Sequence, residues 1–354
     1  MPTMARTRAL AAALEPRVDG FLVTTLVNIR YLTGFTGSNA AVLVLPDGST
    51  VLATDGRYAT QAAAETDGVD IVVARSVGPE LVSHAAAAGL RQVGIERRQV
   101  SLTAYDALLA AAGDMALIDA GPLVERLRIV KDDDELSAIA TACQVTDEVF
   151  AAVLSTLRAG VSERDVAWLL RTEMHSRGAE PAFDSIVAFG PDSARPHHQP
   201  TERTLARGDL IKMDFGAAVE GYHSDMTRTV VLGPAAEWQR ELHALVRELQ
   251  RDARAATVTG ALPVELDAEV RRRIIDSGHD VAHGLGHGVG LEIHESPFLV
   301  PGSDADTLVE RVPVTVEPGV YLPGRGGVRI EDTVVVRAGG AEPLTTSPRD
   351  LIEI

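Results

Sequence analysis

The sequence has little cysteine and no excess of basic side chains. The single cysteine, Cys143, cannot form an internal disulfide, which fits a reducing compartment. Lys and Arg total 33 against 50 Asp and Glu, so the net charge is −17 at pH 7. Proteins that bind nucleic acid carry a basic face, and so do proteins held electrostatically on anionic membranes. We therefore expect neither kind of partner.

Long uncharged apolar runs are also absent. No stretch approaches the roughly 18 residues that identify a transmembrane helix. The apolar piece near the N-terminus, Leu10–Leu14, is too short for a signal-peptide core, and Glu15 and Pro16 follow it. These features predict a soluble cytoplasmic protein.

The length of 354 residues favours two domains. In the first third, β-rich runs alternate with helical runs, which is typical of an α/β domain. Residues 28–38 are interpreted as a strand followed by a turn, with a substrate lid or a part of a dimer interface as the alternatives. The pattern changes near residue 122, so the predicted domains are residues 1–122 and 123–354. Asp132 and Glu135 have the spacing of a helix capping box, and one further helical region is expected in residues 236–277.

Two aspartates stand out in residues 210–233, which are predicted to form two strands joined by a turn near Val219–Gly221. A turn centred between 219 and 220 makes Asp214 face Asp225, and a turn centred between 220 and 221 makes them diagonal neighbours. Either way they share one sheet face, where two close carboxylates repel. A divalent cation between them removes this repulsion; the alternative is two surface aspartates on a hairpin.

A glycine-rich segment surrounds His287. Glycine occupies every second position from 284 to 290, which allows something to approach the backbone closely. His283 and His294 lie in the same segment. The glycines make a helical zinc-binding HxxxH pair implausible, and incidental loop histidines are the other interpretation.

Two glutamates flank a turn in residues 314–336. A turn centred at Gly324 sets Glu317 opposite Glu331. A glutamate in an apolar strand needs a partner, which for Glu331 is either a cation shared with the other acids or Arg329. Together the motifs supply four carboxylates and one imidazole. Such a set balances two divalent ions and favours Mn²⁺, Co²⁺ or Fe²⁺ over thiolate-loving zinc sites.

These motifs, in this order and spacing, resemble those of the pita-bread metallopeptidase superfamily, which includes methionine aminopeptidase, prolidase, aminopeptidase P and creatinase. The resemblance rests on the segments DFG (214–216), SDMTRT (224–229), GHGVGLEIHE (286–295), VEPGVY (316–321) and RIED (329–332). Residues 28–40 and 54–58 resemble the creatinase/prolidase-type N-terminal domain. The resemblance implies an α/β N-terminal domain, an α+β pita-bread catalytic domain and a homodimer.

The resemblance also implies roles for individual residues. The metal ligands are Asp214, Asp225, His287, Glu317 and Glu331. His197 lies near the substrate, and its neighbour His198 stands where many relatives have glycine. His294 stabilises the tetrahedral intermediate, and Glu317 also carries the proton of the attacking water. The remaining residues on the substrate side are His283, Tyr321 and Arg329.

The expected activity is hydrolysis of the bond between an N-terminal residue and proline, with two divalent ions, most simply manganese and otherwise cobalt, iron or zinc. An Xaa-Pro dipeptidase is favoured slightly over an Xaa-Pro aminopeptidase that acts on longer peptides. Creatinase uses this fold without metals, and the full ligand set argues against it. The N-terminal domain disfavours methionine aminopeptidase. A non-catalytic binding module of the same fold is the alternative from another class.

Overall fold

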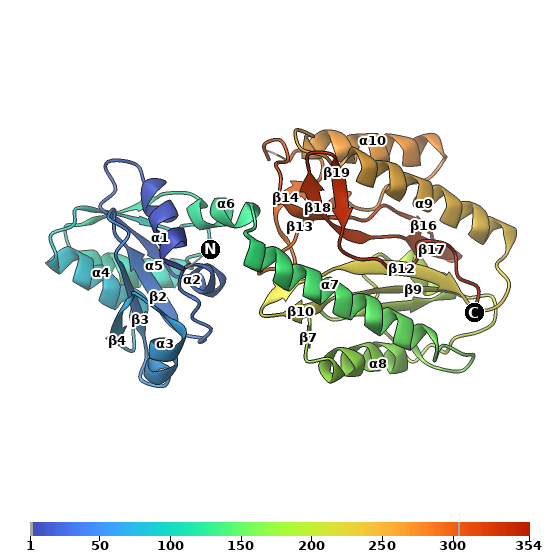
Figure 1. The fold of residues 1–354 in the computed structure, drawn as a ribbon, viewed down its shortest axis with the longest axis horizontal. Coiled ribbons are helices and arrows are strands. Elements are labelled where there is room, and N and C mark those ends of the chain that lie inside the picture. The colour runs from blue at the N-terminus through green and yellow to red at the C-terminus, as the bar shows by residue number, and fades with distance from the viewer. Residues whose placement is uncertain (1–2, 304) are drawn as a thin grey trace. The chain divides into compact units, whose positions relative to one another are not determined.

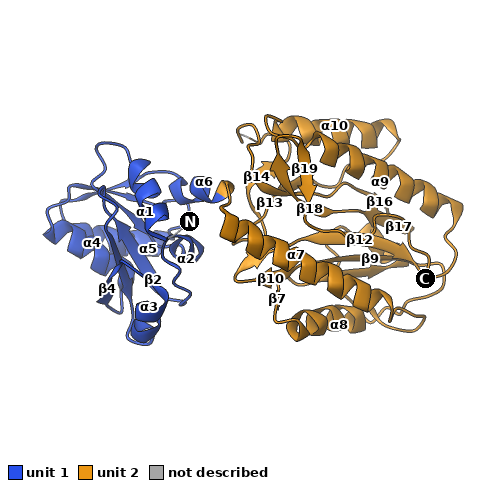
Figure 2. Cartoon of the chain, viewed as in Figure 1, with its two compact units in different colours: residues 1–128 blue, residues 129–354 orange. Residues whose placement is uncertain are grey.

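The computed structural model describes residues 3–303 and 305–354, which form two compact units (Figure 2). The first unit comprises residues 1–128 and the second residues 129–354. The division lies near the end of helix α6 (Leu123–Ile129), whereas the sequence pattern placed the boundary after residue 122.

The first unit is built on one six-stranded mixed sheet in the order β4-β3-β2-β1-β5-β6. β1 and β2 are antiparallel, as are β2 and β3, while β5 and β6 add in parallel, which gives the predicted α/β architecture. The strands are β1 (Gly20–Val23), β2 (Ala40–Val44), β3 (Thr50–Thr54), β4 (Asp70–Val73), β5 (Gln92–Ile95) and β6 (Ala116–Asp119). The other helices are α1 (Thr3–Ala12), α2 (Leu26–Thr33), α3 (Ala59–Glu65), α4 (Val77–Ala87) and α5 (Leu102–Ala112).

The prediction of a strand and turn in residues 28–38 is wrong, because residues 28–33 belong to helix α2. Ile29 and Leu32, three residues apart, are both fully buried, so one face of the helix packs into the core. The buried side chain of Asn28 donates to Glu96. Gly34 ends the helix in the left-handed region at φ 83°, where its N–H donates to the Arg30 carbonyl.

The second unit surrounds several small sheets with four helices (Figure 1). Its sheets have the orders β12-β9-β8, β11-β10-β7, β14-β13-β15-β18-β19 and β16-β17. The elements are α7 (Asp133–Leu154), α8 (Glu163–Ser176), β7 (Glu180–Pro181), β8 (Ile186–Phe189), the 3₁₀ helix η1 (Gly190–Ala194), β9 (Leu210–Phe215), β10 (Ala217–Val219), β11 (Tyr222–His223), β12 (Met226–Val231), α9 (Glu237–Ala256), α10 (Pro263–Asp276), β13 (Gly286–Gly288), β14 (Glu295–Leu299), β15 (Pro313–Val316), β16 (Gly319–Leu322), β17 (Gly326–Arg329), β18 (Asp332–Arg337) and β19 (Gly340–Pro343).

Helix α7 begins where the sequence predicts, since Asp132 and Glu135 form the reciprocal capping box. By length and composition alone α7 could cross a membrane, although half of its most apolar stretch is buried inside the protein. Val149, Phe150 and Val153 belong to a buried cluster with Met213 and Phe215 of β9. The apolar character of α7 is therefore accounted for by packing within the second unit.

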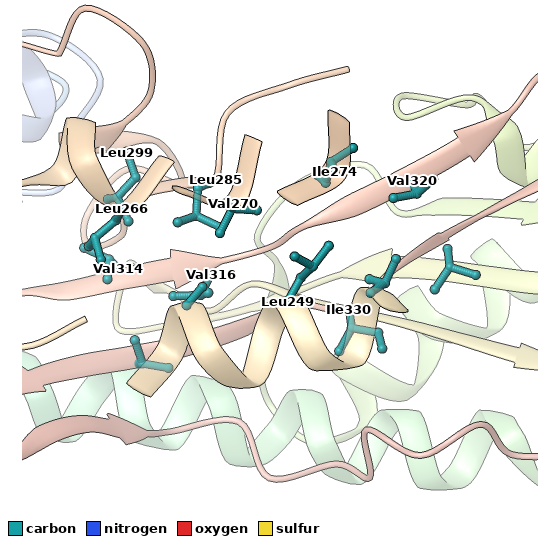
Figure 3. Close-up of a cluster of buried hydrophobic side chains, with 14 of the residues drawn as sticks. Leu249, Leu266, Val270, Ile274, Leu285, Leu299, Val314, Val316, Val320 and Ile330 are labelled. Atoms are coloured by element: carbon teal, nitrogen blue, oxygen red, sulfur yellow. The ribbon is translucent and has the colours of Figure 1, made fainter. Parts of the chain in front are cut away.

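The helical region predicted in residues 236–277 is confirmed and consists of the two helices α9 and α10. Gly260 takes φ 89° between α9 and α10, and Pro263 occupies the first turn of α10. Both helices contribute apolar side chains to one large core, drawn in Figure 3, in which Leu249 and Val270 join Val314 and Val316 of β15.

A buried guanidinium ties the strands of the second unit together. Arg228 on β12 donates to the carbonyls of Thr227, Glu331 and Ser347 and to the Asp332 carboxylate at 2.8 Å. Asp332 also accepts from Arg349 and from Gln250 of α9. These bonds join β12, β18, α9 and the C-terminal segment.

Replacing Arg228 by Met should therefore lower the free energy of unfolding of the second unit by about 3–5 kcal/mol, because buried acceptors lose their donor and Asp332 loses a cation. Denaturation followed by tryptophan fluorescence measures this selectively, since both tryptophans, Trp168 and Trp238, belong to the second unit. Arg164→Met is the control. It removes an exposed ion pair with Glu202, worth about 0–1 kcal/mol. Equal effects of the two changes would contradict the role of Arg228.

Candidate metal centre

The two aspartates come from one hairpin. In the pairing of β9 with β12, Asp214 lies opposite Thr227, and Asp225 directly precedes β12. The outer pair β10–β11 keeps the same register, with Ala218 opposite His223. The diagonal arrangement, which requires the turn to centre between residues 220 and 221, is therefore confirmed. Glu220 and Gly221 both have positive φ there.

The imidazole comes from the short strand β13, where the glycines have a steric reason. A Cβ on Gly286 would lie 2.1 Å from the Thr315 carbonyl oxygen, and one on Gly288 would lie 2.4 Å from that of Ser296. Only glycine lets β13 lie this close to its neighbours. The segment is a strand, so the rejection of a helical zinc motif is confirmed.

The two glutamates flank the β16–β17 hairpin. Gly319 pairs with Arg329 and Leu322 with Gly326, so the turn centres on Gly324, which has φ 74°. Glu317 and Glu331 lie just beyond the paired residues, in the predicted register.

The structure brings all five side chains to one cavity of about 250 Å³. Ligand atoms of Asp225, His287 and Glu331 all lie within 4.8 Å of one another. The Nε2 atom of His287 is 3.7 Å from Oδ2 of Asp225 and 3.5 Å from Oε1 of Glu317. Asp214 lines the same cavity.

The protein chain alone leaves this cluster electrostatically unbalanced. Burial, followed by the charge of Glu331, raises the pKa of Asp225 well above its ordinary value. Burial and neighbouring carboxylates act likewise on Glu331, and burial raises the pKa of Glu317 to about 7. Asp214 Oδ1 and Asp225 Oδ1 are buried without a hydrogen-bond partner among the described residues. Orphaned carboxylate oxygens beside a buried imidazole fit the oxygen-rich coordination of divalent ions.

A network of hydrogen bonds fixes the orientation of the carboxylates. Arg329 pairs with Asp214 through Nη2 and donates to Thr227 Oγ1 at 3.0 Å through Nε. Thr227 in turn donates to Glu331 Oε2 at 2.7 Å. Partners of this kind set the geometry of a metal site from outside the ligand set.

The same network defines the tautomer of His283. Arg329 can only donate, so the Tyr321 oxygen accepts from Nη1 at 2.8 Å. The single Tyr321 hydroxyl proton is then donated to Nε2 of His283, also at 2.8 Å, and Nδ1 of His283 donates to the Gly284 carbonyl. Both ring nitrogens are engaged, so His283 orients Tyr321. His283 also lines the cavity, and its predicted contact with the substrate stays a prediction.

The two other predicted histidines, His197 and His294, have exposed side chains that line the cavity. The ring centroid of His294 lies 4.3 Å from that of His287, edge to face. Burial lowers the pKa of His294, so its ring is neutral at pH 7 and donates from one N–H.

Several residues in and around the cavity were not predicted from the sequence. Lys212 is fully buried next to Asp214 on β9, and Lys131 forms a buried ion pair at 2.5 Å with Glu295, the residue after His294. An apolar wall completes the cavity: Phe183, Ile186, Ile293, Phe298 and Val300. Their spacing in the sequence follows neither a motif nor a period.

A second cluster is formed by Glu163, Asp192 and His198, whose possible ligand atoms also lie close enough together to hold an ion. The Glu163 carboxylate, however, already accepts bonds from His198, Phe189 N–H and both the N–H and hydroxyl of Thr201. Arg195 and Arg203 lie beside Asp192. This group is saturated with donors and cations, in contrast to the orphaned oxygens of Asp214 and Asp225.

Two family models together cover most of the chain. Residues 137–338 match metallopeptidase family M24, and residues 5–130 match the creatinase/prolidase N-terminal domain. The chain belongs to metallopeptidase family M24. The predicted family, two-domain fold class and metallopeptidase activity are thereby confirmed, and divalent metal ions follow from the family.

Relatives of this M24 enzyme span its whole length. It is 33% identical over 339 residues to a Xaa-Pro dipeptidase of Pyrococcus horikoshii, covering 95% of each chain. Its fold is similar to that of a Xaa-Pro dipeptidase from Bacillus anthracis, with a TM-score of 0.95, 37% identity and coverage of 99% and 100%. A similar likeness, with a TM-score of 0.91 and 35% identity, holds for an X-Pro aminopeptidase from Thermotoga maritima, with 100% of each chain covered. The ligand and substrate roles of individual residues stay predictions.

The unbalanced carboxylates predict an unusual pH dependence. In metal-free M24 enzyme the free energy of unfolding should fall as pH rises from about 7 to about 8. Asp225 and Glu331 have folded pKa values well above their unfolded ones, so they hold protons that the unfolded chain has already released. His283, His287 and His243, with folded pKa values near 4, and His294, whose pKa is also lowered, act in the opposite sense, and their effect fades as pH rises through the unfolded value of 6.5.

Tryptophan fluorescence in denaturant after chelation measures this slope, and added Mn²⁺ should abolish it because divalent ions bind the deprotonated acids. Asp225→Asn should flatten the slope without metal. A metal-free protein that gains stability over this range would contradict the electrostatic account.

Proposed function

We propose that this M24 enzyme hydrolyses the peptide bond between an N-terminal residue and proline, using two divalent ions held by Asp214, Asp225, His287, Glu317 and Glu331. The proposal rests on the convergence of these side chains on one cavity, where Oδ1 of Asp214 and Oδ1 of Asp225 are buried without a hydrogen-bond partner among the described residues. The named activity of its full-length relatives supports the choice of substrate. A carboxylate-rich set with one imidazole favours Mn²⁺, with Co²⁺, Fe²⁺ or Zn²⁺ as alternatives.

Bound divalent ions activate water and polarise the scissile carbonyl. The protein supplies the remaining steps. Glu317 carries the proton of the attacking water to the leaving nitrogen. Neutral His294 donates a hydrogen bond to the oxygen that becomes negative, and His197 contacts the substrate from the rim of the cavity. Arg329 and Thr227 hold the acids in place.

Proline explains why a dedicated site is needed. The X-Pro bond is a tertiary amide without an N–H, and the ring fixes φ. Proteases that bind their substrate through that N–H handle it poorly. The apolar wall formed by residues such as Phe183, Ile186 and Phe298 suits a pyrrolidine ring, which needs burial but no hydrogen-bond donor.

Asp225→Asn should abolish turnover of Ala-Pro, by at least about 10³-fold in kcat, because a central carboxylate loses the charge that holds the ions. The fold should survive, since the backbone N–H and carbonyl of Asp225 keep their bonds to Thr333. Metal analysis and far-ultraviolet circular dichroism accompany the assay. Near-normal turnover in a folded, metal-depleted variant would contradict the proposal.

A second candidate is an Xaa-Pro aminopeptidase acting on longer peptides, and one observation favours it. A dipeptide carries a free carboxylate beside its proline, which calls for a cation. Arg329 is the one Lys or Arg among the described residues lining the cavity, and Asp214, Tyr321 and Thr227 already engage it. Among the described residues that line the cavity, no further Lys or Arg is therefore available to a dipeptide carboxylate.

Comparison of Ala-Pro, Ala-Pro-amide and Ala-Pro-Ala separates the two activities. A dipeptidase prefers Ala-Pro in kcat/KM, whereas the cavity described here predicts that Ala-Pro-Ala and the amide are cleaved at least as well as Ala-Pro. A preference for Ala-Pro of about tenfold or more would mean that a cation outside this cavity recognises the carboxylate. Cytoplasmic location and a homodimeric state stay predictions from the sequence.

A further inference from the structure

His197 is exposed, yet the residues on both sides of it are held in place. It lies in residues 190–209, which connect β8 to β9 through the 3₁₀ helix η1. The next residue, His198, is buried. A histidine that must meet a substrate from a loop needs such support, since loops are the more mobile parts of a protein.

The carboxylate of Glu163 holds the chain before and after His197 through hydrogen bonds. This first residue of α8 is fully buried, and its Oε2 atom is 2.8 Å from Nε2 of His198. The same oxygen accepts from the Thr201 N–H at 2.9 Å and from the Thr201 hydroxyl at 2.7 Å. Its other oxygen accepts from the N–H of Phe189 at 2.8 Å. One carboxylate therefore joins Phe189, before His197, to His198 and Thr201 after it.

Two buried basic side chains hold the residues directly before His197. Lys212 of β9 donates to the carbonyls of Arg195 and Pro196, and Arg329 donates to the Pro196 carbonyl at 3.3 Å. Ser193 also donates its hydroxyl to the Gly190 carbonyl and accepts from the Gly327 N–H of β17. The peptide units before His197 are thus fixed to the strands that carry Asp214 and Arg329.

We propose that Glu163 and His198 form a clamp that positions His197 toward the substrate. The clamp acts through the backbone and does not itself touch the substrate. This inference rests on the proposed function. The physical basis is preorganisation: an exposed side chain whose neighbours are locked loses little entropy on meeting its ligand. Neither clamp residue lines the cavity, so their effect on turnover passes through His197.

A double-mutant cycle tests the clamp. His198→Ala should lower kcat/KM for an Xaa-Pro peptide by about 10- to 100-fold, the range for partners that orient a functional group. In a His197→Ala background the same change should cost less than about twofold, because the group being positioned is gone. His198→Gln, whose amide nitrogen can still donate to Glu163, should restore most of the activity. Metal content should be equal in all variants.

The matched control is Glu202→Gln, which removes an exposed carboxylate from the same loop. It should leave kcat/KM unchanged. Full additivity of the His197 and His198 changes, or a loss explained by missing metal, would overturn the clamp.

Amide hydrogen exchange gives a readout independent of activity. Peptides covering residues 190–203 should exchange faster in His198→Ala and in Glu163→Gln, with the rest of the second unit unchanged. Unchanged exchange in that segment would overturn the clamp even if catalysis falls. If the wild-type protein cleaves no Xaa-Pro peptide, the proposed function fails while this exchange measurement still decides the clamp.

Discussion

Like-charge repulsion inside a buried cavity is the constraint around which the second unit is organised. Four carboxylates converge on one cavity beside the buried imidazole of His287. Taking them out of water and placing them together disfavours their ionised forms, which is why Asp225, Glu317 and Glu331 all have raised pKa values. Divalent cations remove this cost, so the chain is built to be complete only with its metal.

Hydrogen bonds and ion pairs in the surrounding fold hold these acids together against their mutual repulsion. Arg329 pairs with Asp214 and reaches Glu331 through Thr227, while Arg228 ties the backbone of Glu331 to β12 and to the C-terminal segment. Glycines at 286 and 288 let β13 lie close enough for His287 to reach Asp225. The site is thus positioned by strands and buried ion pairs, which are more rigid supports than loops.

Local patterns with short-range physical causes were predictable from the sequence. The pairing of Glu317 with Glu331 follows from a turn at Gly324, and the start of α7 from the Asp132 capping box. For Asp214 and Asp225 the sequence predicted one shared sheet face but left two registers open, and the structure selects the diagonal one. Helix α2 was missed because its signal is tertiary, with Asn28 anchored by the distant Glu96. The Glu163–His198 bond and the Lys212 contacts were also invisible, since they join residues far apart in the chain by burial and not by spacing.

Anomalous diffraction from crystals grown with Mn²⁺ tests the central claim most directly. The account predicts two manganese peaks inside the cavity, with the oxygens of Asp214, Asp225, Glu317 and Glu331 and the Nε2 atom of His287 as their protein ligands. It also predicts no peak at Glu163, Asp192 and His198. Manganese bound at that second cluster, or a cavity without manganese between its carboxylates, would contradict the account.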